Sequence, residues 1–187
     1  MTTVIGISGS LRGGSLNSAL LRAAAGAMPK DAKLEIGSIK GIPLYDGDVE
    51  ATQGLPDAVV KLKERVVAAD GLLLVTPEYN NSIPGVFKNA IDWLSRPDAD
   101  IPRVFGGRPV GVIGASPGGF GTLLSQTAWL PVLKTLRTAA YFGGRLQVSR
   151  AGDVFKSGEL VDERIREQLE KYLAGFCEFV AATRRAS

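Results

Sequence analysis

The most constraining feature of the sequence is a pair of apolar runs, residues 72–75 (LLLV) and 110–113 (VGVI), that contain no polar side chain. Strands buried on both faces of a parallel sheet have this pattern, whereas half-exposed strands alternate apolar and polar residues. Strand-length runs and helical patterns alternate along the chain, which is typical of right-handed βαβ units. The predicted strands are residues 3–8, 33–38, 71–77, 109–115 and 143–149, and the predicted helices are residues 16–28, 56–69, 83–95, 121–138 and 162–183. We therefore expect an α/β fold in which helices cover both faces of a parallel sheet.

The length and composition favour one domain over two. The chain has 187 residues, of which 45% are hydrophobic, and this is enough to bury one sizeable core. We find no internal repeat, low-complexity tract or separating linker, so residues 1–187 are expected to form a single domain. Two stretches rich in Pro, Gly and Asp, residues 41–54 and 96–107, are predicted to be loops that act as lids or acceptor-site walls.

The composition excludes several functional classes. The chain has no histidine, and Cys177 is its only cysteine. Intrachain disulfides, Cys/His zinc sites and His-based triads are therefore excluded, no metal site is expected, and redox chemistry would require a bound cofactor. The net charge is +3 and the one local basic cluster is Arg184 with Arg185, which argues against a nucleic-acid partner. No signal-peptide pattern and no apolar run of membrane-spanning length is present, so a soluble, cytoplasmic protein is expected.

The loop after the first predicted strand has the chemistry of a phosphate site. Residues 8–17 (SGSLRGGSLN) run from this strand directly into a predicted helix. Glycines let the backbone turn and present N–H groups, serine hydroxyls add donors, and the helix N-terminus adds positive partial charge. The loop lacks the G-x-G-x-x-G spacing of dinucleotide sites and the Gly-Lys-Ser/Thr of a P-loop, which favours a monophosphate. The alternative is an ordinary loop in which Ser15 or Asn17 only caps the helix, and Arg12 either pairs with the phosphate or lies in water.

Two further loops follow the central strands. Residues 76–85 and 115–121 leave the carboxyl ends of the third and fourth strands, where open α/β sheets bind ligands. Pro77, Tyr79 and Asn80 could form a wall beside a planar heteroaromatic ring. The N–H groups of Gly118 and Gly119 could stabilise negative charge at the opposite ring edge. The alternative is that the first loop is a simple turn and the second only begins a helix.

Four segments match a known pattern when they are taken together. They are residues 9–12 (GSLR) with Ser15 and Asn17, residues 76–80 (TPEYN), residues 84–93 (PGVFKNAIDW) and residues 116–119 (SPGG). As a set, these segments resemble the NADPH-dependent FMN reductase family, the flavodoxin-like group that includes bacterial quinone, chromate and azo-dye reductases. The resemblance implies a flavodoxin-like three-layer αβα sandwich whose five-stranded parallel sheet has the strand order 2-1-3-4-5.

The resemblance also implies FMN as the cofactor and assigns its contacts. The phosphate is expected to bind Ser10, Arg12, Ser15, Leu16 and Asn17, partly through backbone groups. The isoalloxazine ring is expected to contact Pro77, Glu78, Tyr79 and Asn80 from one loop, and Ser116, Pro117, Gly118 and Gly119 from the other. No catalytic acid or base is expected, because the flavin carries the chemistry.

The implied activity is that of an FMN-dependent NAD(P)H oxidoreductase. NADPH or NADH is expected to give hydride to bound FMN and to leave before a quinone, free flavin, azo compound or chromate takes the electrons, in a ping-pong cycle. One alternative is a flavodoxin-type electron carrier between protein partners. Proteins of that carrier class are generally strongly acidic, whereas this chain has a pI of about 9.1. A flavin-free regulatory or scaffold protein is a third reading.

The resemblance further implies a homodimer or homotetramer, with the predicted helix 121–138 in the position of the family's subunit-contact helix. This helix departs from the family because residues 129–131 (WLP) lie in its middle. A proline there removes one hydrogen bond of the helix and is predicted to kink it. Trp129 could be an interface anchor or a core residue.

Overall fold

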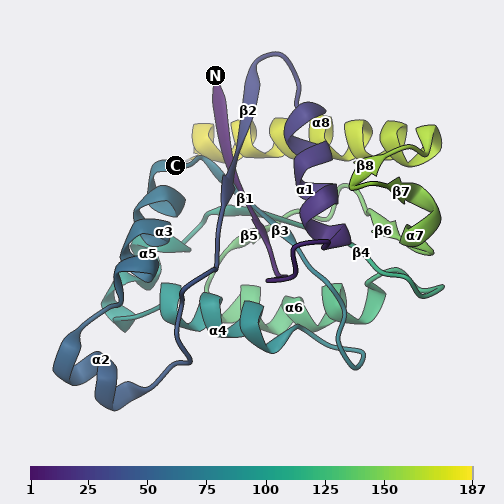
Figure 1. Ribbon diagram of the computed structural model, residues 1–187. Coiled ribbons are helices and arrows are strands. Elements are labelled where there is room, and N and C mark those ends of the chain that lie inside the picture. Colours follow the sequence, from purple (N-terminus) through teal and green to yellow (C-terminus); the bar gives the residue numbers. More distant parts are fainter. Residues whose placement is uncertain (187) are drawn as a thin grey trace.

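A parallel sheet forms the centre of the computed structural model, which describes the backbone of residues 1–186 and the side chains of residues 1–183 (Figure 1). The basic pair Arg184 and Arg185 lies outside the described side chains. The strands are β1 (Thr2–Ser8), β2 (Ala32–Gly37), β3 (Gly71–Val75), β4 (Pro109–Ala115), β5 (Ala139–Ala140) and β6 (Gln147–Val148). Their order is β2-β1-β3-β4-β5, and β6 pairs with β4 as well. The predicted parallel sheet and its strand order are confirmed.

The register of the sheet brings three strand ends together. Ser8 at the end of β1 lies opposite Val75 at the end of β3, and Val75 lies opposite Ile113 near the end of β4. Because all three strands run in the same direction, their carboxyl ends share one edge of the sheet. The loops that follow β1, β3 and β4 therefore leave the sheet side by side.

Two layers of helices cover the sheet. Val4, Leu73 and Val75 face one core, which is closed by α1 (Leu16–Gly26) and α8 (Glu163–Ala186). The alternate residues Ile5 and Leu72 face the other core, which is closed by α3 (Asp57–Ala68), α4 (Gly85–Leu94) and α6 (Leu123–Thr135). Figure 1 shows α8 on one side of the sheet and α4 with α6 on the opposite side. The three-layer αβα sandwich is confirmed, and these five helices match the predicted ones within one helical turn at each end.

The predicted strand at residues 143–149 is wrong in its extent. The edge of the sheet is formed instead by two short pieces: β5 pairs with Pro109 and Val110 at the start of β4, and β6 pairs with Gly114 and Ala115 at its end. Between the pieces, the Tyr141 ring packs against α8, with its centroid 5.4 Å from that of Tyr172. Glycines at 143 and 144 weaken strand pairing, so the chain leaves the sheet in this stretch.

The two segments predicted to be loops contain short helices. Residues 41–54 include α2 (Gly47–Gln53), whose cap Asp46 accepts a hydrogen bond from the Asp48 N–H at 2.9 Å. Residues 96–107 include η1 (Asp98–Asp100) and α5 (Ile101–Val104). This second segment leads into the first residue of β4 and so meets the amino edge of the sheet. It lies at the opposite edge from the three loops, which contradicts its expected role as an acceptor-site wall.

Further small elements follow β6. They are α7 (Ala151–Val154) and a hairpin of β7 (Phe155–Lys156) and β8 (Glu159–Leu160), none of which the sequence pattern predicted. Phe155 and Leu160 are buried in the core beneath α1 and α8. The hairpin therefore extends that helical layer of the fold.

Trp129 is a core residue, which decides between its two predicted roles. Its side chain is fully buried, its ring lies edge-on to Phe87 at a centroid distance of 5.0 Å, and its Nε1 donates to Thr76 Oγ1 at 3.1 Å. Helix α6 continues through Pro131, which is exposed. Helix α6 is therefore formed despite its internal proline, and Trp129 connects this helix to Thr76, the residue that follows β3.

Candidate functional site

The loops after β1, β3 and β4 line one cavity of about 80 Å³ at the carboxyl edge of the sheet. Its lining residues are Ser10, Arg12, Ser15, Leu16, Asn17, Pro77, Glu78, Tyr79, Ala115, Ser116 and Pro117. Of the predicted site residues, only Asn80, Gly118 and Gly119 lie outside this wall, and they belong to the same loops. Ala115 lines the cavity although it was not predicted. Its position as the last residue of a buried strand was the signal that could have identified it.

The start of α1 offers hydrogen-bond donors to a ligand. Ser15 is the N-cap of α1, and its Oγ accepts a hydrogen bond from the Ser18 N–H at 3.2 Å. Among the described residues, the main-chain N–H groups of Ser15, Leu16 and Asn17 have no hydrogen-bond partner. Ser15 therefore caps the helix and keeps its hydroxyl proton free for an acceptor. A phosphate fits this arrangement of donors at a helix N-terminus.

Gly9 sets how closely the β1–α1 loop approaches α4. Its N–H donates to the Val75 carbonyl at 2.9 Å, which extends the sheet by one bond. A Cβ atom at this position would lie 2.2 Å from Cδ1 of Phe87, so a side chain is excluded while the ring keeps its place. The close packing of the β1–α1 loop against α4 therefore requires glycine at this position.

Asn17 joins the β1–α1 loop to the end of β4. Its side chain is 4% exposed, its Nδ2 donates to the Ala115 carbonyl at 2.8 Å, and its Oδ1 accepts from the Ala115 N–H at 2.9 Å. The side-chain amide is thus engaged with the protein at both ends. Of the donors of Asn17, the main-chain N–H is the one without a partner among the described residues.

The β3–α4 loop presents Tyr79 at the rim of the cavity. Tyr79 and Ser82 exchange two main-chain hydrogen bonds of 3.1 Å, and the central residues Asn80 and Asn81 have φ values of 49° and 61°. Two positive φ angles between paired residues define a type I′ turn, in which asparagine is favoured. The Tyr79 side chain is 45% exposed, so its ring is accessible from solvent.

Glu78 connects the same loop to α6. Its Oε2 accepts hydrogen bonds from the Leu124 N–H at 2.8 Å and the Ser125 N–H at 3.0 Å. A carboxylate at this position also interacts favourably with the positive end of the helix. Because the carboxylate is hydrogen-bonded to α6, the predicted contact of Glu78 with the ring would have to be made by its main-chain groups.

The β4–α6 loop is held from the side of β6 and α7. The Ser116 N–H donates to the Val148 carbonyl at 3.0 Å, and the Gly118 carbonyl accepts from the Arg150 N–H at 3.0 Å. Within the described part of the chain, the N–H groups of Gly118 and Gly119 have no partner. The loop is therefore anchored while two neighbouring main-chain donors stay available.

A polar cluster holds the 41–54 segment against α4. Nε1 of Trp93 donates to the Pro43 carbonyl at 2.9 Å, and Nε of Arg96 donates to Glu50 at 2.8 Å. The hydrogen bond from Arg96, followed by one from Tyr45, holds the pKa of Glu50 below its usual range, although partial burial opposes the shift. The pKa of Tyr45 is raised, chiefly by its hydrogen bond to Glu50. This cluster fixes the segment that follows β2.

Among the described side chains, no group of three or more His, Cys, Asp or Glu is arranged to hold a metal ion. Within residues 1–186, no helix has both the length and the apolar character needed to cross a membrane.

The fold and site define a flavodoxin-like α/β protein, in which the strand order 2-1-3-4-5 places a phosphate-type loop after the first strand. A family model described as NADPH-dependent FMN reductase matches residues 2–153, and the chain belongs to that family. The predicted family is confirmed, and with it the class of FMN-dependent oxidoreductase that uses NAD(P)H as electron donor.

Individual relatives agree with this membership over nearly their whole length. An NAD(P)H-dependent FMN reductase of Pseudomonas aeruginosa is 44% identical over 171 residues, which are 91% of this chain and 90% of the relative. A 2-hydroxy-1,4-benzoquinone reductase of a Burkholderia species is 36% identical over 178 residues, 92% of each chain. Among solved structures, FerB, a flavoenzyme NAD(P)H:(acceptor) oxidoreductase of Paracoccus denitrificans, has a TM-score of 0.87 and 30% identity, covering 98% of this chain and 99% of FerB.

Proposed function

We propose that this chain is an FMN-dependent NAD(P)H:quinone oxidoreductase built as one domain. The observation that carries the proposal is the convergence of three loops on one cavity, with unpartnered main-chain N–H groups at the start of α1 and in the β4–α6 loop. These donors match a phosphate at one end and an electron-rich ring edge at the other. The Burkholderia relative, whose name gives a quinone as substrate, supports a quinone as acceptor.

The proposed phosphate site is the loop between β1 and α1. Ser10, Ser15 and Arg12 would contribute side-chain donors, while Leu16 and Asn17 would contribute main-chain N–H groups. Such charge-assisted hydrogen bonds are stronger than neutral ones, so the phosphate would provide much of the binding energy. Because the cavity is small, about 80 Å³, it suits this end of FMN, and the ring would extend along the rim formed by the other two loops.

The proposed ring site lies between the β3–α4 and β4–α6 loops. Bound FMN would supply the redox chemistry, taking hydride from NAD(P)H and giving electrons to the acceptor. The N–H groups of Gly118 and Gly119 would stabilise negative charge on the pyrimidine side of the ring. Tyr79, exposed at the rim, would contact the nicotinamide and the acceptor in turn, since both use the same open face in a ping-pong cycle. Pro77, Asn80, Ser116 and Pro117 would complete the ring contacts.

The proposal is tested first by flavin binding and then by turnover. Purified protein given excess FMN should turn yellow and gain thermal stability, and NADPH or NADH should bleach the bound flavin in a stopped-flow experiment. A benzoquinone should then restore the colour. Reduction that occurs only with a reductase partner would instead support an electron carrier, and failure to bind FMN would contradict the site.

A variant of Tyr79 tests the proposed rim. Tyr79→Ala should raise the KM values for the nucleotide and the quinone while the FMN content stays unchanged, because the ring of Tyr79 is proposed to contact ligands on the open face and not the phosphate. Asn81→Gly is the matched control in the same turn, since glycine accepts the positive φ of 61° without strain. Loss of FMN from Tyr79→Ala would contradict the assignment.

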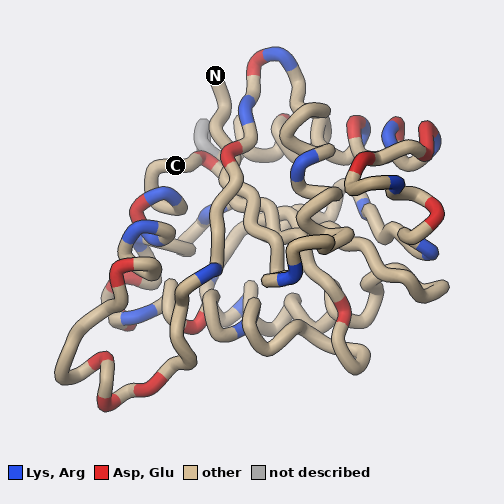
Figure 2. The backbone as a smooth tube through the Cα atoms, in the orientation of Figure 1, with Lys and Arg blue, Asp and Glu red and all other residues tan. Residues whose placement is uncertain are grey.

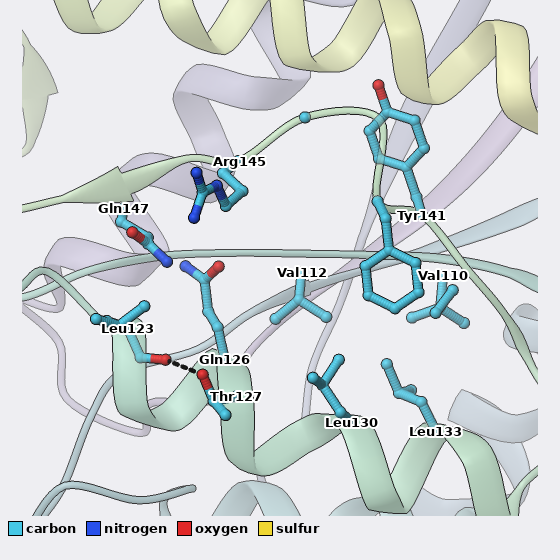
Figure 3. A pocket seen from close by; sticks show the side chains of 13 residues that line it. Val110, Val112, Leu123, Gln126, Thr127, Leu130, Leu133, Tyr141, Arg145 and Gln147 are labelled. Atoms are coloured by element: carbon cyan, nitrogen blue, oxygen red, sulfur yellow. Dashed lines mark hydrogen bonds between the residues drawn. The ribbon is translucent and has the colours of Figure 1, made fainter.

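We further propose a homodimer or homotetramer formed through the edge of the sheet beside α6. A cavity of about 230 Å³ opens there, and Figure 3 shows Leu130 and Leu133 of α6 facing Val110 and Val112 of β4 across it. Three of its lining residues are exposed apolar side chains: Leu123, Leu130 and Phe142. Patches of this kind mark interaction surfaces. Light scattering should give a multiple of the 19.7 kDa chain mass, and Phe142→Glu should lower it.

The same proposal includes a cytoplasmic location, because pyridine nucleotides are the proposed electron donors. Free flavin, azo compounds and chromate are the further acceptors to compare with a quinone in the same assay. The relative kcat/KM values of these acceptors would identify the preferred class.

A further inference from the structure

A second cavity, of about 300 Å³, adjoins the first on the side of β2. It lies between the β1–α1 loop, α1 and the residues that follow β2, and it shares Ser10 and Arg12 with the first cavity. Its charged lining residues are Arg12, Arg22 and Lys40, and the described residues that line it include no Asp or Glu. Three cations with no carboxylate favour an anionic ligand.

None of the three cations is neutralised by the described residues of the protein itself, and with Arg12 assigned to the FMN phosphate, Arg22 and Lys40 are left for a second anion. None of them forms an ion pair within the described part of the chain, whereas Lys33 at the start of β2 is paired with Glu35 at 2.7 Å. Arg22 makes one hydrogen bond to the Gly158 carbonyl at 3.3 Å, which leaves most of its donors available. Figure 2 shows basic residues on the β1–α1 loop and on the segment after β2, with no acidic residue between them in this view.

The residues that follow β1 and β2 form two similar turns, each closed by a hydrogen bond to a serine hydroxyl. The Arg12 N–H donates to Ser10 Oγ at 3.3 Å after β1, and the Lys40 N–H donates to Ser38 Oγ at 3.2 Å after β2. Each serine accepts one bond and keeps its hydroxyl proton as a donor. Each of the neighbouring strands β1 and β2 is thus followed by one serine hydroxyl and one cationic side chain that line the same cavity.

The cavity also has an apolar wall. Leu11 and Ile36 line it, and their side chains are 45% and 44% exposed, which is high for large aliphatic residues. An aromatic base could pack against these side chains while a phosphate meets the cations and hydroxyls. A phosphorylated nucleoside combines both requirements.

We propose that this cavity binds the adenosine 2′-phosphate end of NADPH and makes the enzyme prefer NADPH to NADH. The inference rests on the proposed oxidoreductase function, because a dinucleotide whose nicotinamide lies over the proposed ring site can extend along the first cavity, past the shared residues Ser10 and Arg12, into the second. NADH has a 2′-hydroxyl where NADPH carries a phosphate, and it would leave Arg22 and Lys40 without an anion.

Calorimetric titration of the FMN-loaded protein with 2′-phospho-ADP-ribose and with ADP-ribose tests this directly. The 2′-phosphate should tighten binding by about tenfold or more, because it adds charge-assisted hydrogen bonds to two cations. In the double variant R22A/K40A the two ligands should bind equally, and the KM for NADPH should rise to that for NADH. Both side chains are exposed, so the fold should be kept.

Lys61→Ala is the matched control. Lys61 is an exposed lysine of α3 that lines the neighbouring cavity rather than this one, so its loss should leave the preference intact. Equal affinity of the wild type for the two ligands would overturn the proposal. Inorganic phosphate that binds as tightly as 2′-phospho-ADP-ribose would point to a free-anion site, and loss of FMN from R22A/K40A would assign the cavity to the flavin; either result also overturns it.

Failure of the proposed function would look different. A wild-type protein that oxidises neither nucleotide but still binds 2′-phospho-ADP-ribose more tightly than ADP-ribose would contradict the quinone reductase activity and support the nucleotide site.

Discussion

Asn17 and Ala115 are 98 positions apart in the sequence and are joined by two hydrogen bonds, of 2.8 and 2.9 Å, in the interior of the protein. The pair connects the first turn of α1 to the last residue of β4. Through it, the loop proposed to hold a phosphate and the loop proposed to hold a ring are fixed relative to each other. The distance between the two halves of the site thus depends on one buried amide.

Asn17→Ala should destabilise the protein even without flavin. The change leaves the buried N–H and C=O of Ala115 without partners, which costs about 1–3 kcal/mol. Urea unfolding of flavin-free protein should show this loss, and FMN affinity should fall as well, because the two loops lose their connection. Asn81→Gly, at an exposed position, should leave the unfolding free energy nearly unchanged. Normal stability of Asn17→Ala combined with weak FMN binding would mean that the side chain acts on the ligand alone.

Ser15→Ala should weaken FMN binding through the phosphate. The substitution removes a hydroxyl donor aimed at a doubly charged group, and FMN affinity should fall by about 1–3 kcal/mol. Riboflavin has no phosphate, so its affinity should change much less in the same fluorescence titration. Ser15→Thr keeps both the cap and the donor and should bind FMN nearly as well as the wild type. An equal loss for both flavins would assign the effect to the helix cap.

Glu78→Ala should loosen the contact between the β3–α4 loop and α6. The N–H groups of Leu124 and Ser125 lose their acceptor, and capping losses of this kind cost about 0.5–2 kcal/mol. Thermal unfolding should show the loss. Glu78→Gln keeps an acceptor oxygen but no charge, so it should fall between the wild type and Glu78→Ala. If both variants were as stable as the wild type, the two hydrogen bonds would contribute nothing to the fold.

The arrangement of the sheet could be predicted because its causes are local in the sequence. Apolar runs such as residues 72–75 identify buried strands, and parallel strands always present their carboxyl ends at one edge. The meeting of the three loops followed from that rule. Most of the predicted site residues accordingly line one cavity.

The roles of individual side chains could not be predicted, because their partners are distant in the sequence. The Glu78 carboxylate bonds to Leu124 and Ser125, 46 and 47 positions away, and nothing near Glu78 in the sequence indicates this. The fifth strand was misplaced for a similar reason. Tyr141 leaves the sheet to pack against Tyr172 and α8, which local strand propensity does not report.

Gly9→Ala should destabilise the protein because there is no room for a Cβ atom beside the Phe87 ring. The added carbon would lie 2.2 Å from Cδ1 of Phe87, and overpacking of this kind typically costs about 1–3 kcal/mol. Gly13→Ala, in the same loop, is the control, since a Cβ atom there would meet nothing within 4 Å. Chemical denaturation should separate the two variants, and equal stabilities would show that Phe87 moves aside freely.

Glu50→Gln should change how stability depends on pH. The pKa of Glu50 in the folded protein lies below its ordinary value of 4.5, chiefly because Arg96 donates a hydrogen bond to its carboxylate. A group whose pKa is lowered on folding stabilises the protein above its unfolded pKa, and this contribution is lost as the pH falls through the folded value. The wild type should therefore have a higher Tm than Glu50→Gln at neutral pH, and the difference should shrink as the pH falls from 4.5.

The matched control for Glu50→Gln is Glu167→Gln. Glu167 is exposed on α8 and its carboxylate forms no hydrogen bond or ion pair with the described residues, so its replacement should leave the Tm unchanged across the same pH range. A Tm difference between the wild type and Glu50→Gln that stayed constant down to acidic pH would contradict the argument, because a contribution from the ionised carboxylate must vanish once that group is protonated. A difference that grew on acidification would have the wrong sign for a lowered pKa. Either outcome would mean that Glu50 holds the segment between β2 and α3 through contacts other than its charge.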